Sequence, residues 1–303
     1  MKLSKKKTMV AMIRSRTFFV LAFFLLALPS SDLRAQPDSV NQKRLTTVIV
    51  SSAVILPSTY FGLYHLWYKN SPHQSFTFFN DNHEWKQVDK AGHFISSFYF
   101  AYGSSQVLRW TNYRPTKADV AGAVAGFLIT APIEIFDGHS EAYGASSGDL
   151  IADAAGPLFF VGQKRLWNEI RIQPKFSFHR TKYAELRPNL LGDNLPSEIL
   201  KDYNGQTYWL TVHMDKFTYF PKWLNVAVGY GADGMVYARD RENAFHGYSA
   251  YRQYYLSVDF DLTAIRTRSK FVKTLVFLAS AIKLPAPALQ FSKKGVDFRG
   301  FYF

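Results

Sequence analysis

The stretch that decides the fold reads DKAGHFISSFYFAYGSSQVLR and occupies residues 89–109. Its inner residues, 91–108, include no Asp, Glu, Lys or Arg. An uncharged run of eighteen residues predicts a helix that is buried in a protein or approaches the length of a membrane span. Two more apolar helical stretches, 117–135 and 147–168, follow after breaks that are rich in Pro, Gly and Asn.

An earlier run, 45–68, carries no charged residue over twenty-four positions, which is long enough to cross a bilayer as a helix. Pro57 would kink this helix. Aromatic residues gather near its end, as in an interfacial belt: Tyr60, Tyr64, Trp67 and Tyr68. A buried or surface-lying helix is the alternative. We therefore expect a bundle of about four helices over residues 36–170 that touches or partly enters a membrane, with membrane lipid as a partner.

Small residues at helical spacing predict that one pair of helices in this bundle packs closely. Gly122 and Gly126 form a G-x-x-x-G step, and Ala118 lies one turn earlier. Such residues let two helix backbones approach each other in lipid or in a protein core.

After about residue 171 the pattern changes to alternation with a period of two. The segments 208–214, 224–230 and 254–262 alternate and are rich in β-branched and aromatic residues, which predicts strands. We interpret Gly229, Gly231 and Gly234 as a turn or bulge between short strands.

Two later segments complete the predicted architecture. The spacing in 271–282 predicts one late helix, and 296–303 alternates weakly. The predicted fold class is α+β: a bundle of about four apolar helices, followed by a small antiparallel β-rich domain over residues 171–303.

The charge distribution argues against a nucleic-acid partner. The 303 residues carry 36 Lys plus Arg, 23 Asp plus Glu, and a net charge of +13. Nearly half of the excess lies in residues 1–35, where a basic start precedes an apolar run, 18–28, that is too short to span a bilayer. We predict a signal peptide at 1–35, with an uncleaved anchor as the alternative.

The chain has no cysteine, which excludes a disulfide scaffold, a cysteine-ligated zinc site, a cysteine nucleophile and a lipidated cysteine within it. The rest of the charge excess is spread over residues 166–303, while 36–165 is neutral. This distribution fits an exported protein near anionic lipid better than a nucleic-acid binder.

Polar residues stand in pairs three or four apart near the ends of the predicted helices, so each pair shares a helix face. The pairs are Asp89 with His93, Glu134 with Asp137, and Asp149 with Asp153. Buried charges must pair with one another or hold an ion, because an unpaired buried charge costs several kcal/mol. The spacing alone leaves open both a structural network, which it favours, and a chemical site.

The chemical interpretation assigns two overlapping sets of residues. The candidate general acid–base residues are Asp89, His93, Glu134 and Asp137. The candidate ligands of a divalent metal are His93, Glu134, Asp149 and Asp153. In the structural interpretation, Lys90 pairs with Asp153, and Asp89 and Asp149 are favoured as first-turn acids by the helix dipole.

These blocks resemble a known family. Asp-Lys-Ala-Gly-His-Phe at 89–94, Glu-Ile-Phe-Asp at 134–137 and the Gly-Ala-Ser-Ser-Gly-Asp-Leu block at 144–156 are similar in order and spacing to the YfiM-like family of predicted periplasmic lipoproteins. A more distant similarity is to VanZ-like membrane proteins. The chain departs from the lipoproteins because it lacks cysteine and carries Asp153 where Asn is common.

The resemblance implies an exported protein in the periplasm or outer membrane of a Gram-negative envelope. It also groups Lys90, Gly92 and Gly156 with the polar network. Our first hypothesis is a membrane-associated envelope protein whose buried His/carboxylate network has a structural or ion-binding role. The alternatives are a metal- or carboxylate-dependent hydrolase acting on a lipid or cell-wall substrate, and an outer-membrane β-barrel component. Fewer clear strands than the eight of a minimal barrel count against the last.

Overall fold

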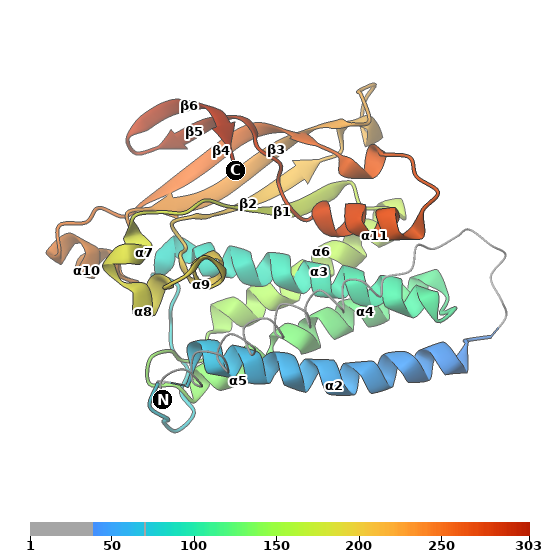
Figure 1. Cartoon of the computed structure of the whole chain (residues 1–303), viewed down its shortest axis with the longest axis horizontal. Helices are drawn as coiled ribbons and strands as arrows, with labels where there is room; N and C mark the ends of the chain where they lie inside the picture. Colours follow the sequence, from blue (N-terminus) through green and yellow to red (C-terminus); the bar gives the residue numbers. More distant parts are fainter. Residues whose placement is uncertain (1–38, 70) are drawn as a thin grey trace, which may run out of the picture.

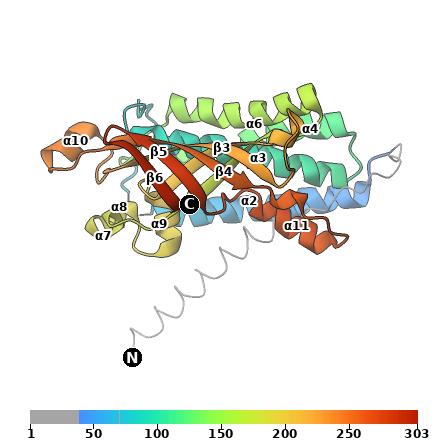
Figure 2. The ribbon, with the colours of Figure 1, turned by 90° about the horizontal axis from the view of Figure 1, so that it is seen from above.

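The computed structural model describes residues 39–69 and 71–303, so the predicted signal peptide at 1–35 lies outside the described residues. A layer of roughly parallel helices lies beneath an antiparallel sheet (Figure 1), and the view from above shows the sheet crossing the helices (Figure 2). The predicted α+β class, with helices first and strands later, is confirmed.

Four long helices form the helical layer, as predicted: α2 (Gln42–Trp67), α3 (Val88–Trp110), α4 (Pro115–Thr130) and α6 (Ser147–Trp167). The stretch predicted as a single helix over 117–135 is two helices, because Pro132 begins a separate α5 (Pro132–Gly138). Two helical segments are long and apolar enough to cross a membrane, Gln42–Trp67 and Pro115–Gly138. In the first segment, none of the apolar stretch is buried by the described residues. In the second segment, about a third of the apolar stretch is buried.

Helix α3 is the centre of the helical layer, and small residues let α4 and α6 lie directly against it. A Cβ added at Gly122 or Gly126 of α4 would lie 2.7 Å from backbone atoms of Ala101 on α3. A Cβ at Gly156 of α6 would overlap the carbonyl oxygen of Phe94. The close approach predicted from the G-x-x-x-G step is therefore confirmed.

The sheet has six strands in simple sequence order: β1 (Ile172–Phe178), β2 (Gln206–Val212), β3 (Leu224–Asp233), β4 (Tyr251–Phe260), β5 (Ala286–Ser292) and β6 (Gly295–Tyr302). The alternation predicted β2, β3, β4 and β6, and the late helix is α11 (Lys270–Ala279). It did not predict β1 and β5, whose Pro174 and Pro287 weaken a strand pattern.

Shorter helices lie in the connections between these elements. They are α7 (Tyr183–Leu186), α8 (Pro188–Leu191), α9 (Leu195–Lys201) and α10 (Asp240–Phe245), with 3₁₀ turns η1 (Trp85–Gln87), η2 (Met214–Lys216) and η3 (Leu262–Ala264).

The interpretation of Gly229 and Gly231 as a turn between strands is wrong, because both lie inside β3. Gly229 pairs with Trp209 across the strands, and a Cβ there would lie 2.6 Å from the indole ring. The missing side chain thus makes room for Trp209, which packs with Ala227, Tyr255 and Ala288 in the interior of the sheet. Gly234 does follow the strand, with a φ of 81° that favours glycine.

Helix α3 also joins the two layers. Its first residue, Val88, packs with Ala232 and Met235 at the end of β3. Further along, the Tyr99 hydroxyl donates a hydrogen bond of 2.5 Å to the carbonyl of Pro174 in β1. The sheet therefore rests on the helix that carries the first polar block of the sequence.

We expect Gly156→Val to destabilise the protein by about 1–3 kcal/mol or more, because the added atoms have no room against the backbone of α3. Chemical denaturation would measure the change. Gly162 on the same helix is the matched control, since a Cβ there meets no atom within 4 Å among the described residues. Equal losses at both positions would contradict the packing argument.

Candidate functional site

The three polar blocks converge at one end of the helical layer. Asp89, Lys90 and His93 lie in the first turns of α3, and Asp149 and Asp153 lie in the first turns of α6. Glu134 and Asp137 belong to the short α5. Residues that are far apart in the sequence thus form one cluster.

Lys90 is the centre of charge in this cluster. Its ammonium nitrogen lies 2.8 Å from Asp81, 3.1 Å from Asp149 and 3.4 Å from Asp89. The alternative pairing of Lys90 with Asp153 is wrong. Asp81, which the sequence patterns did not indicate, lies in the loop before α3. It contacts the same ammonium group of Lys90 as Asp149 of α6 does.

Asp153 pairs with His93 instead, with 3.0 Å between its Oδ1 and the imidazole Nδ1. Asp153 is fully buried. Burial opposes protonation of the ring, but the hydrogen bond to Asp153 and the charges of Asp149 and Asp153 raise the pKa of His93 to about 9. Because Nδ1 is engaged by Asp153, Nε2 is the ring nitrogen available to a ligand or a cation.

The carboxylate of Glu134, which belongs to α5, is held by a hydrogen bond at the start of α6. Its Oε2 accepts a hydrogen bond of 2.7 Å from the backbone N–H of Ser146. Ser146 caps α6 by accepting from the N–H of Asp149, and its hydroxyl donates to Asp81. The second carboxylate oxygen, Oε1, is buried and has no hydrogen-bond partner among the described residues. Burial raises the pKa of Glu134 to about 8.

Two groups of side chains in this cluster converge closely enough that they could hold a metal ion. His93, Glu134 and Asp149 each offer a ligand atom, and the three atoms lie within 4.8 Å of one another. A second such group, Asp81, Asp89 and Asp149, shares one member with the first. Imidazole nitrogen with carboxylate oxygens is a donor set that Zn²⁺ and related divalent cations accept.

Two other predicted site residues lie beside these groups and contribute in different ways. Asp153 contacts the far nitrogen of His93 and orients the ring. Asp137 accepts a hydrogen bond of 2.7 Å from the hydroxyl of Tyr68, the residue that ends α2. Burial raises the pKa of Asp137 to about 6. This bond ties α2 to the cluster.

The cluster holds more negative than positive charge. Six carboxylates, Asp81, Asp89, Glu134, Asp137, Asp149 and Asp153, surround Lys90 and His93. Burial raises the pKa of Asp149 to about 7 and also raises that of Asp89. Excess buried charge of this kind is relieved when carboxylates take up protons or when the cluster binds a cation.

Gly92 and Gly156, the two glycines predicted to belong to the network, act by leaving room for neighbouring atoms. A Cβ at Gly92 would lie 2.8 Å from the hydroxyl oxygen of Tyr208 on β2. Gly156 brings α6 against α3, one turn beyond Asp153. Gly156 therefore sets the separation of α3 and α6, which carry His93 and Asp153, whereas Gly92 sets the approach of α3 to the sheet.

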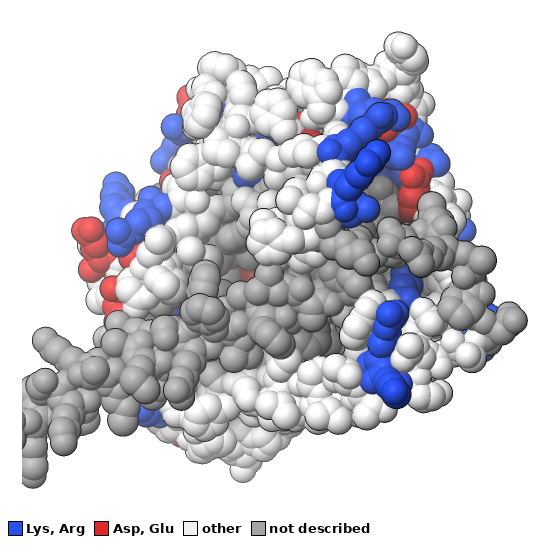
Figure 3. All heavy atoms as spheres, turned by 45° about the vertical axis from the view of Figure 1, so that its right-hand side comes forward, with Lys and Arg blue, Asp and Glu red and all other residues white. Residues whose placement is uncertain are grey.

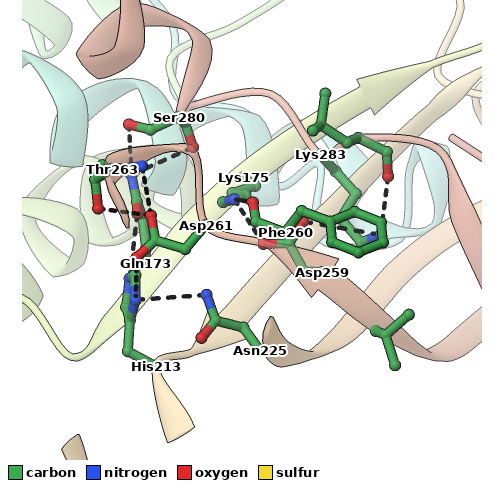
Figure 4. Close-up of polar contacts among 12 residues, drawn as sticks. Gln173, Lys175, His213, Asn225, Asp259, Phe260, Asp261, Thr263, Ser280 and Lys283 are labelled. Atoms are coloured by element: carbon green, nitrogen blue, oxygen red, sulfur yellow. Dashed lines mark hydrogen bonds and ion pairs between the residues drawn. The ribbon is translucent and has the colours of Figure 1, made fainter. Parts of the chain in front are cut away.

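A second polar cluster, which the sequence analysis missed, lies inside the sheet (Figure 4). Lys175 on β1 is 2.5 Å from Asp259 on β4, and Lys283, just before β5, is 3.9 Å from the same carboxylate. All three side chains are almost fully buried. The sequence pattern did not indicate this cluster, because it predicted neither the strand β1 nor the position of Lys283 inside the sheet.

The comparisons with known proteins concern the helical layer. Residues 77–161 match the model of a family described as predicted periplasmic lipoprotein (DUF2279). The match includes Asp81, Asp153 and all cluster residues between them, but it covers less than a third of the chain. No curated protein and no solved structure matches the chain. The chain is an exported protein of the Gram-negative periplasm or envelope.

We expect Asp153→Asn to lower the pKa of His93 from about 9, because the variant loses the partner charge that favours imidazolium. In the wild type, the pairing stabilises the fold fully below the unfolded histidine pKa of about 6.5, and this contribution is lost as pH rises through about 9. NMR titration of the His93 ring would measure the change. An unchanged pKa would show that Asp153 does not hold the proton.

Proposed function

We propose that this exported envelope protein binds a divalent cation through His93, Glu134 and Asp149, with Asp153 orienting the imidazole. The observation that carries the proposal is the buried Oε1 of Glu134, which lacks a partner among the described residues and belongs to a group of three converging ligand atoms. A purely structural network would be expected to satisfy such an atom.

The excess of carboxylates in the cluster favours a cation over a neutral molecule as the bound ligand. Lys90 already contacts Asp81, Asp89 and Asp149, so the remaining carboxylates depend on His93 or on protons for compensation. A divalent ion would replace those protons. Lys90 would then hold the loop and both helix ends in place around the ion.

We expect Zn²⁺ to bind the wild-type protein with one ion per chain, measured by isothermal titration calorimetry on protein that has been treated with a chelator. Affinity should rise between about pH 6 and pH 9, because the ligands must lose protons with pKa values of about 7 for Asp149, 8 for Glu134 and 9 for His93. Glu134→Gln and His93→Ala should each weaken binding by about tenfold or more.

The control is Glu141→Gln, which removes an exposed carboxylate from the loop between α5 and α6. Circular dichroism would verify that each variant is folded. Folded variants that bind Zn²⁺ as tightly as the wild type would refute the proposed ligands, and a wild-type protein that binds no Zn²⁺ or Mn²⁺ would favour the structural network.

Membrane association is part of the proposal and rests on α2. None of its residues is buried by the described part of the chain, although the helix carries no Asp, Glu, Lys or Arg after Arg44. Ile49, Val54 and Phe61 are among its exposed side chains. A surface of this kind is favourable only against lipid or another apolar partner. The hydrogen bond from Tyr68 to Asp137 would place the polar cluster beside that contact.

Hydrolysis of a lipid or cell-wall substrate is the second candidate, favoured by the same unpartnered oxygen of Glu134. Glu134 could accept a proton from the attacking water, and His93, held protonated by Asp153, could supply one to the leaving oxygen. In this candidate His93 and Glu134 are not ligands, because a protonated imidazole has no lone pair for a metal. A divalent cation would instead be held by Asp81, Asp89 and Asp149, and it would supply Lewis-acid polarisation of the substrate.

For this candidate, we expect purified protein with Zn²⁺ to release product from phospholipid or peptidoglycan fragments. The rate should fall at least a hundredfold in Glu134→Gln, which retains the shape but not the base. Mass spectrometry of the substrates would detect the products. Cation binding without any product from either substrate class would leave the binding role and remove the hydrolase.

A further inference from the structure

The sheet has an inverted polarity. Along β4, the buried positions are Tyr251, Gln253, Tyr255, Ser257 and Asp259, whereas Tyr254, Leu256 and Val258 point to the other face and are exposed. A strand that packs on an apolar core in water shows the reverse arrangement. The same inversion recurs in β5, where Gln290 is buried between the exposed Leu289 and Phe291.

The strand register makes the exposed side chains one continuous face. Leu256 on β4 pairs with Leu289 on β5, which pairs with Phe298 on β6. A second row joins Tyr254, Phe291 and Val296 in the same order. We call these six residues, together with Val258, the outer apolar face.

The neighbouring part of the same sheet face is covered, which shows what this surface requires. On β2 and β3, Tyr208 and Tyr230 pack against Val88 of α3. On β4 to β6, no described element takes the place of α3, and Phe298 is 70% exposed. An uncovered apolar area that continues a buried one needs an apolar partner.

Charge at one end of the face indicates what that partner is. Arg252 is the next outward-facing residue of β4 beyond Tyr254, and Lys293 and Lys294 form the turn between β5 and β6. All three are exposed, and each also bonds within the protein: Arg252 donates to Tyr230 and Gln87, Lys293 to Ser249, and Lys294 to the hydroxyl of Tyr251. At the other end, exposed Trp223 stacks on Phe260. An apolar band with a cationic margin and an aromatic margin matches the acyl layer and the anionic headgroups of a bilayer.

On the face seen in Figure 3, Lys and Arg gather in a few separate groups, and the white areas beside them carry no Lys, Arg, Asp or Glu.

We propose that the outer apolar face lies on an anionic membrane surface, with Leu256, Phe291 and Phe298 in the acyl layer and Arg252, Lys293 and Lys294 at the headgroups. The free edge of β6 limits how deeply the sheet can enter the bilayer. Its backbone groups on that side have no strand partner among the described residues, so they must stay in the hydrated headgroup region. The sheet therefore lies at the interface and does not cross the hydrocarbon.

The absence of cysteine from the chain allows a direct test with single thiols. Phe298→Cys places a label on the outer apolar face, and Phe245→Cys places one on α10, where the phenylalanine is even more exposed but lies off the sheet. Each full-length variant carries an environment-sensitive fluorophore and is mixed with vesicles of phosphatidylglycerol and phosphatidylcholine. We expect a blue shift at position 298 and none at 245.

The charge requirement is tested with the same label. Vesicles of phosphatidylcholine alone should bind more weakly, and changing Arg252, Lys293 or Lys294 to Gln should weaken binding to the mixed vesicles by about fivefold each. Arg241→Gln, at an exposed arginine of α10, the helix that carries the Phe245 control, is the matched control.

Three outcomes would overturn the proposal. A blue shift at position 298 that depends on protein concentration and not on vesicles would assign the face to a second copy of the chain. Vesicle binding with an unshifted label at 298 would assign the membrane contact to another surface, such as α2. Binding that is insensitive to both anionic lipid and the three charge variants would remove the headgroup contact.

Discussion

The ion cluster around Lys90 is the interaction on which the helical layer depends. One ammonium group is shared by the loop before α3, by α3 itself and by the start of α6. Because a buried lysine without carboxylates would be strongly unfavourable, these three segments must meet for the fold to form. Gly156 then lets α6 approach α3 closely enough for His93 to reach Asp153. The ion cluster and the helix packing are therefore parts of one arrangement.

The same cluster is not electrically balanced. A network that served only to hold the helices would need about as many carboxylates as cations, yet six carboxylates surround one lysine and one histidine. The raised pKa values of Glu134 and Asp149 express that excess as a tendency to hold protons near neutral pH. Either protons or a cation could supply the missing positive charge, and this imbalance is the physical basis of the proposed cation binding.

The sequence was informative where the signal was periodic and local. The uncharged run at 91–108 and its neighbours located the long helices, and pairs spaced by three or four residues identified most of the cluster. Asp81 was missed because it lies in a loop, where no periodicity constrains its direction. The partner of Lys90 was misassigned because spacing along a helix gives the face of a side chain but not which neighbouring helix turn it meets. Pro174 and Pro287 concealed β1 and β5, since prolines in edge or bulged strands look like breaks.

The interior of the sheet has the opposite imbalance of charge, with more cations than carboxylates in its ion cluster. In its interior, Lys175 and Lys283 flank the single carboxylate of Asp259, and burial lowers the pKa of Lys283 to about 8. Buried ion pairs contribute little net stability compared with an apolar core of the same volume. Their presence inside the sheet is understandable if the opposite face cannot be polar. The alternation that turns Leu256 and Val258 outward necessarily turns Ser257 and Asp259 inward, because successive side chains of a strand point to opposite faces. A requirement for an apolar outer surface would therefore confine the polar residues of this strand, Asp259 among them, to its inward-facing positions.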